Sequence, residues 1–182
     1  MEKELGLYIS AAPDVDSECE ALGRLLAEMT KGVRWTIKRT PSPPQRLNPD
    51  LHHLRRSHFY LILLGQDVVA PMGVELDAAR AAQLLLMPFR SRAATPSPAA
   101  AHFYHHSNLH WQWYDTPHEF VRQFERRLLA ELIAGTPGYG LDLADIEELS
   151  VRLKALEGGE PPSAEDDPRQ GAGRGGVIFP AS

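Results

Sequence analysis

Only one cysteine, Cys19, occurs among the 182 residues, and no long apolar run is present. A single cysteine excludes an internal disulfide framework and is compatible with a reducing compartment. The longest apolar run, residues 59–64, has the length of a strand, whereas a membrane helix requires about 20 apolar residues. The N-terminus lacks a basic stretch followed by an apolar segment, so we expect no signal peptide. These absences predict a cytoplasmic protein without a membrane association.

Motifs that hold cofactors or metals are also missing. The sequence contains no Gly-x-Gly-x-x-Gly, no phosphate-binding P-loop, no Cys-x-x-Cys and no serine nucleophile elbow, so we predict no cofactor. His102, His106 and His110 would share one face of a continuous helix, a spacing that can bind zinc. Ser107 and Asn108 are expected to end that helix, however, and no cysteine or acidic residue stands among the histidines. We therefore predict no metal. The net charge of −5 argues against a nucleic-acid partner.

Apolar runs alternate with segments of helical periodicity along most of the chain. Strands are predicted over residues 5–10, 33–38, 58–64, 84–89 and 111–114. Helices are predicted between and after them, over about residues 15–30, 47–56, 72–83, 98–106 and 117–133. Asp14 or Asp16 is expected to cap the first helix, and Thr116 the last one. This order of elements predicts an α/β domain with a parallel sheet covered by helices on both faces.

Composition divides the chain into three parts. Residues 1–134 form the predicted domain, and residues 135–157 add a C-terminal helical extension. Residues 158–182 are rich in Gly, Pro and charged side chains, which bury too little apolar area to fold alone. An apolar triplet, Val177-Ile178-Phe179, lies near the end of this tail. It is either an incidental chain end or a partner-binding peptide that pairs with a sheet edge or fills a partner's groove.

Ligands of parallel α/β sheets bind beyond the carboxyl ends of the strands. The candidate ligand-binding residues are those that follow or end the predicted strands, namely Ser10, Gly65, Gln66, Asp67, Arg90 and Tyr114. Arg90 and Arg92 could attract an anionic ligand. The aromatic residues from Trp111 to Tyr114 either stack against a ring or pack against the following helix.

Two blocks of sequence resemble a known family. The first is Leu7-Tyr8-Ile9-Ser10-Ala11-Ala12-Pro13-Asp14 with the Glu-rich segment after it, and the second runs from Leu63 to Ala79. Both are similar to the corresponding parts of Toll/interleukin-receptor-like (TIR-like) domains, including bacterial domains of unknown function. The second block also resembles nucleoside 2-deoxyribosyltransferases. The resemblance spans about residues 5–134 and implies a flavodoxin-like, three-layer fold with five parallel strands in the order 2-1-3-4-5.

The resemblance gives Glu75 a particular role. In catalytic members of these groups, a Glu at this position of the helix attacks or stabilises the anomeric carbon while an N-glycosidic bond breaks. It implies that Glu75 is catalytic and that NAD or a nucleotide is the ligand, held in part by the amides of the preceding loop. The alternative role for Glu75 is a first-turn acid that interacts favourably with the helix dipole.

Two functions follow from these residues. The transferases carry an Asp at the end of the strand and Gly-Thr-Ala/Ser before the Glu, whereas here Gly65-Gln66 and Pro71-Met72-Gly73 stand in those places. This departure favours a TIR-like signalling or protein-interaction module in a bacterial conflict or regulatory system, which binds a protein partner or self-associates. The other function is an NAD or nucleotide N-glycosidase that uses Glu75. A nucleotide sensor without turnover is a third interpretation.

Overall fold

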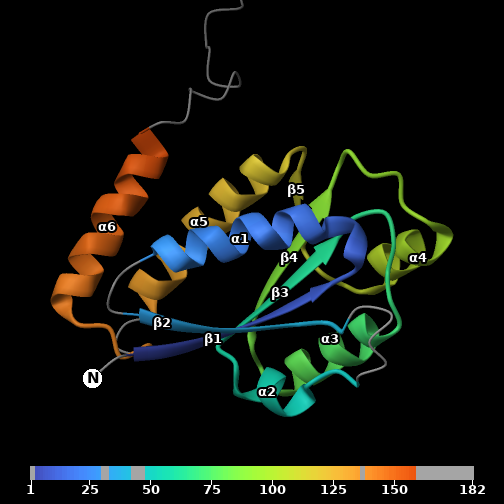
Figure 1. Ribbon diagram of the computed structural model, residues 1–182, viewed down its shortest axis with the longest axis horizontal. Coiled ribbons are helices and arrows are strands. Elements are labelled where there is room, and N and C mark those ends of the chain that lie inside the picture. The colour runs from blue at the N-terminus through green and yellow to red at the C-terminus, as the bar shows by residue number, and fades with distance from the viewer. Residues whose placement is uncertain (1–2, 30–32, 42–47, 136–137, 159–182) are drawn as a thin grey trace, which may run out of the picture.

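The protein is built on a single five-stranded sheet in which every pair of neighbouring strands is parallel (Figure 1). The computed structural model describes residues 3–29, 33–41, 48–135 and 138–158. The strand order is β2-β1-β3-β4-β5, so the predicted α/β class, the flavodoxin-like architecture and the 2-1-3-4-5 order are confirmed. The direction of winding reverses between β1 and β3, which places the switch point of the sheet there.

The strands match the predicted segments closely. Their bounds are β1 Lys3–Ala11, β2 Val33–Arg39, β3 Phe59–Leu64, β4 Leu85–Ser91 and β5 Gln112–Tyr114. All six residues of β3 are buried, as expected for a central strand with helices on both sides. Strand β2 lies at one edge of the sheet, and only part of its surface is buried.

Helices cover both faces of the sheet (Figure 1). On one face lie α1 Asp16–Glu28 and α5 Pro117–Ala134, and α6 Leu143–Gly158 packs against α5. On the other face lie α2 Leu51–Arg56, α3 Pro71–Ala81 and α4 Pro98–His106. Two hydrophobic clusters correspond to these two faces, and the larger one includes Leu149 of α6. No helix among the described residues is long and apolar enough to cross a membrane.

Local sequence signals explain where most helices begin. The Ser97 hydroxyl accepts a hydrogen bond from the Ala100 amide at the start of α4, and the Thr116 hydroxyl accepts one from the Glu119 amide at the start of α5. The expected cap of α1 is wrong. A short 3-10 helix, η1 Pro13–Val15, precedes α1, and neither Asp14 nor Asp16 caps it. The extra turn aims the Asp14 carboxylate at the loop after β3 instead.

Candidate functional site

A buried carboxylate lies on the α3 side of the sheet, surrounded by hydroxyl groups. Glu75, in the second turn of α3, has no exposed surface. Its Oε1 accepts a hydrogen bond from the Tyr8 hydroxyl at 2.8 Å, and its Oε2 accepts one each from the Ser10 and Thr40 hydroxyls, both at 2.6 Å. We refer to Tyr8, Ser10, Thr40 and Glu75 as the hydroxyl–carboxylate cluster.

Three separate segments meet in this cluster. Tyr8 and Ser10 are two residues apart on β1, so the alternation of the strand turns both toward α3. Thr40 directly follows β2, and its backbone amide donates to the Ile9 carbonyl at 2.9 Å. Its hydroxyl also accepts from the Ala11 amide at 3.1 Å. Thr40 is therefore tied to β1 through its backbone and its hydroxyl, and the same hydroxyl ties it to α3.

Hydroxyl donors, rather than a cation, accompany the Glu75 carboxylate. No Lys, Arg or His among the described residues forms an ion pair with it. Charge-assisted hydrogen bonds of this kind are about twice as strong as neutral ones, so three of them compensate for much of the lost hydration. Burial and the adjacent Glu75 charge raise the pKa of Tyr8 well above its usual value. The Tyr8 hydroxyl therefore remains a donor throughout the neutral pH range.

Tyr60 stands beside the cluster on β3. Its ring stacks on that of Tyr8 with centroids 6.3 Å apart. Its hydroxyl is buried without a hydrogen bond of ordinary geometry, and burial raises the pKa of Tyr60. The neutral phenol of Tyr60 thus borders the cluster on the side of β1 that faces β3.

The loop after β3 contains the amides expected to hold an anionic ligand. Asp14 Oδ2 accepts from the Gln66 amide at 2.5 Å and from the Asp67 amide at 3.4 Å. The Val68 amide donates to the Asp67 carboxylate at 2.8 Å. The acceptors for these three amides are therefore carboxylates of the protein itself. Gly65 lies so close to Asp14 and Val15 that a Cβ there would meet the Val15 side chain at 2.7 Å.

Asp67 links this loop to the start of α4. Its Oδ1 accepts from the Ser97 hydroxyl at 2.8 Å, and the Ser97 amide donates to the Gln66 carbonyl at 2.7 Å. The Ser97 hydroxyl and the Val68 amide hold the pKa of Asp67 below its usual value. Gln66 and Asp67 are exposed, so they form a solvent-facing rim beside the buried cluster.

Alternation along the strands separates the remaining candidate residues. Tyr114 is buried within the hydrophobic cluster on the α1 and α5 face, and its hydroxyl donates to Glu18 at 3.2 Å. Arg90 belongs instead to the environment of α4, where its guanidinium lies over the rings of Tyr104 and Trp113. Ser10 and Glu75 are the predicted site residues that the fold brings into direct contact.

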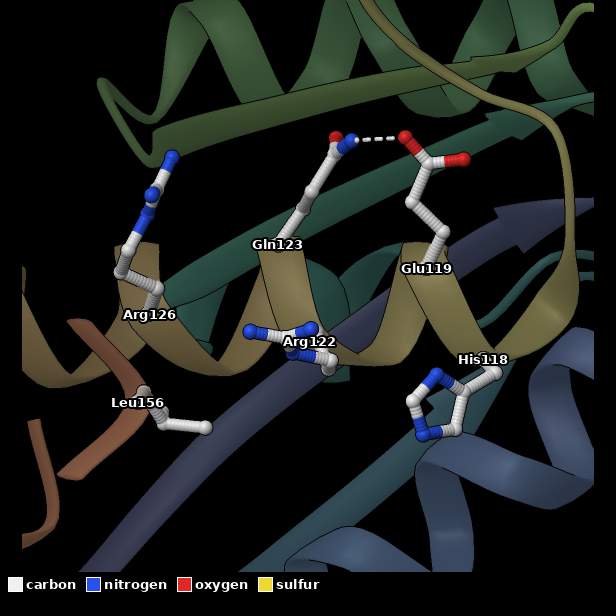
Figure 2. A pocket seen from close by; sticks show the side chains of 6 residues that line it. All are labelled: His118, Glu119, Arg122, Gln123, Arg126 and Leu156. Atoms are coloured by element: carbon white, nitrogen blue, oxygen red, sulfur yellow. Dashed lines mark hydrogen bonds between the residues drawn. The ribbon is translucent and has the colours of Figure 1, made fainter. Parts of the chain in front are cut away.

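Cavities occur at surfaces that the sequence patterns did not point to. One of about 150 Å³ lies between α5 and α6 and is lined by His118, Glu119, Arg122, Gln123, Arg126 and Leu156 (Figure 2). Figure 2 shows the Gln123 amide directed toward Glu119, to which it donates at 2.9 Å. An adjoining cavity of about 490 Å³ shares Gln123 and Arg126 and extends to Trp113 of β5.

A third cavity, of about 270 Å³, lies near the amino ends of β1 and β3. It is lined by Glu4, Gly6, Thr36, His52, His53, Arg56 and His58. His58 Nδ1 accepts from the Gly6 amide at 3.0 Å, and burial lowers the pKa of His58. The histidines that line this cavity do not form a metal-binding cluster, and neither does the stacked pair of His102 and His106 on α4. No such cluster occurs elsewhere among the described residues.

Sequence reasoning missed Tyr8, Thr40 and Tyr104 as parts of these sites. The signal for Tyr8 was present, because it shares the strand alternation of Ser10. The tail triplet Val177-Ile178-Phe179 falls outside the described residues.

Comparison with known proteins gives no match to any family model and no similar curated protein.

Proposed function

We propose that this protein is a TIR-like interaction or signalling module that acts through its helical surfaces. The observation that carries the proposal is the internal satisfaction of the Glu75 carboxylate. Each of its oxygens accepts a hydrogen bond from a neighbouring side chain, and none of its surface is exposed. A carboxylate in this state stabilises the packing of α3 on β1 and presents no free oxygen to a substrate.

The strand-end loop supports the same interpretation. The Asp14 carboxylate accepts hydrogen bonds from the amides of Gln66 and Asp67. These amides are the groups that would otherwise bind a phosphate beside the switch point. Large apolar side chains are exposed elsewhere, on helices. Val151 of α6 is 70% exposed and Val74 of α3 is 53% exposed. These exposed side chains are positions at which an introduced charge would disrupt a protein contact through either helix.

Self-association is the first interaction to test. Sedimentation velocity over a wide concentration range should show reversible assembly of the wild-type chain. Val151→Glu and Val74→Glu place a charge on α6 and α3, respectively, and the one on the contacting surface should abolish assembly. The other variant serves as the matched control. Assembly that both variants leave unchanged would contradict a contact through these helices.

The alternative function is an NAD or nucleotide N-glycosidase. One feature favours it: a carboxylate that pairs with no cation in the described part of the chain lies over β1, next to the switch point where ligands of this fold bind. The Ser10 and Thr40 hydroxyls both donate to its Oε2 and so fix the orientation of the carboxylate. If α3 or the strand-end loop moved, this oxygen could approach the anomeric carbon of a bound ribose.

Base release separates the two functions. Purified protein, at concentrations that allow assembly, is incubated with NAD and with nucleosides, and free base is measured by chromatography. The module predicts no release above that of a Glu75→Gln variant. Release that requires Glu75 but persists in Tyr8→Phe would overturn the module and establish the enzyme. The Tyr8 variant controls for general loosening of the cluster, because it removes one donor but retains the carboxylate.

A further inference from the structure

Arg90 is an enclosed cation at the carboxyl end of β4. Only 8% of its surface is exposed. Its guanidinium carbon lies 3.9 Å from the ring centroid of Tyr104 and 4.7 Å from that of Trp113. Tyr104 belongs to α4 and Trp113 to β5. Two consecutive elements, α4 and β5, thus supply aromatic walls for one charged side chain of β4.

This enclosed cation has no anionic partner. Among the described residues, the Arg90 side chain forms no ion pair and no hydrogen bond, and its Nε is buried without an acceptor. Arg92, two residues later, is different: its side chain is 59% exposed and binds Asp115 at 2.9 Å. Removing a charge from water is costly unless a counter-charge replaces the lost hydration. Ring faces attract a guanidinium but do not accept its in-plane hydrogen bonds.

Arg90 lies at the carboxyl-end edge of the sheet, beyond which ligands of parallel α/β sheets bind, with β3 between its own strand and the switch point. In register it pairs with Leu64, the last residue of β3, and with Trp113 of β5. The two Nη nitrogens have no hydrogen-bond acceptor among the described residues, yet they are not buried. They are therefore the nitrogens of Arg90 that solvent reaches. An arginine held against two rings that themselves meet edge to face presents its remaining edge as a rigid fork of donors. That fork fits two oxygens of one carboxylate or phosphate.

We propose that Arg90, with Tyr104 and Trp113 as its walls, is an anion-binding site for a phosphate or carboxylate group. The anion would accept two parallel hydrogen bonds from the exposed edge of the guanidinium and supply the missing counter-charge. This site is separate from the hydroxyl–carboxylate cluster and does not depend on whether the protein is a module or an enzyme. It gives the protein a means to recognise an acidic small molecule beyond the end of β4.

Nuclear magnetic resonance tests the site without any substitution. The Nε–H resonance of Arg90 is followed while inorganic phosphate, and separately acetate, is added at constant ionic strength. A saturable shift of this resonance is expected, with the better-bound anion identifying the preferred group. A nucleoside monophosphate compared with its parent nucleoside then shows whether a phosphate ester binds better than free phosphate. A resonance unchanged by all of these anions would overturn the proposal.

Variants test whether Arg90 itself carries the binding. Arg90→Gln should weaken binding of the preferred anion by about 10- to 100-fold, the range expected for loss of charge-assisted hydrogen bonds. Arg90→Lys retains the charge but not the fork and should also bind more weakly than the wild type. Arg92→Gln is the matched control and should change the affinity by less than about threefold. An equal loss in Arg92→Gln would instead indicate nonspecific surface attraction and contradict the site.

Discussion

Removal of the Glu75 carboxylate provides the sharpest test of the hydroxyl–carboxylate cluster. In Glu75→Ala, the hydroxyls of Tyr8, Ser10 and Thr40 lose their acceptor. A buried hydroxyl without a partner costs about 1–3 kcal/mol, which gives a gross loss of about 3–9 kcal/mol for three. Release of the buried charge offsets part of this loss. We therefore expect a net decrease of about 3–5 kcal/mol in the free energy of unfolding.

Urea unfolding followed by circular dichroism measures this quantity directly. Glu75→Gln retains the shape and one carbonyl acceptor, so it should lose only about 1–2 kcal/mol. Tyr8→Phe removes a single charge-assisted donor and should lose about 1.5–3 kcal/mol. Both variants should remain folded, since domains of this size are stable by about 5–15 kcal/mol.

A double-substitution cycle isolates the contact itself. Tyr8→Phe should cost less in the Glu75→Ala background than in the wild type, because its acceptor has already been removed. A loss of less than about 1 kcal/mol in Glu75→Ala, or additivity of the two substitutions, would contradict the stabilising role of the cluster.

Four further outcomes follow from the packing. Burial lowers the pKa of His58 from 6.5. The neutral imidazole therefore stabilises the folded protein above pH 6.5, and this stability is lost as the pH falls below that value. In a His58→Gln variant, the free energy of unfolding should decline less steeply on acidification. Gly65→Ala would drive a methyl group into Asp14 and Val15 and should lower stability by about 1–3 kcal/mol. Gly73→Ala meets open space within α3 and should raise stability by about 0.5–1 kcal/mol in the same urea assay. Burial raises the pKa of Cys19 to about 11, so alkylation with iodoacetamide at neutral pH should be slower in the folded protein than in urea; equal rates would contradict the burial.

The order of elements could be predicted because its signals are local, whereas the strand order 2-1-3-4-5 was implied by the family resemblance. The run from Phe59 to Leu64 is apolar at every position, which is typical of a central parallel strand. Thr116, Pro117 and Glu119 marked the start of α5 within a single turn. Glu75 could be singled out as an acid near the start of a helix, but nothing in that helix revealed its donors.

Contacts between distant segments could not be predicted in the same way. Thr40 stands at the start of a proline-rich stretch, and only the parallel register of β1 and β2 brings it beside Ser10. Asp14 has the spacing of a helix cap, yet a single 3-10 turn redirects it to the amides of Gln66 and Asp67. Tyr104 reaches Arg90 only because α4 lies across the end of β4. Each of these depends on tertiary placement, which outweighs local preference.

The hydroxyl–carboxylate cluster also has an evolutionary consequence. Its four members depend on one another, because a hydroxyl without the carboxylate, or the carboxylate without its hydroxyls, is a buried defect. In related sequences we expect these positions to change as a set, with Phe, Ala and Val in place of Tyr8, Ser10 and Thr40 wherever Glu75 is replaced by an apolar residue. If the cluster is structural, its four residues can thus be replaced together by apolar ones. If Glu75 is catalytic, Glu75 would be conserved while its neighbours varied.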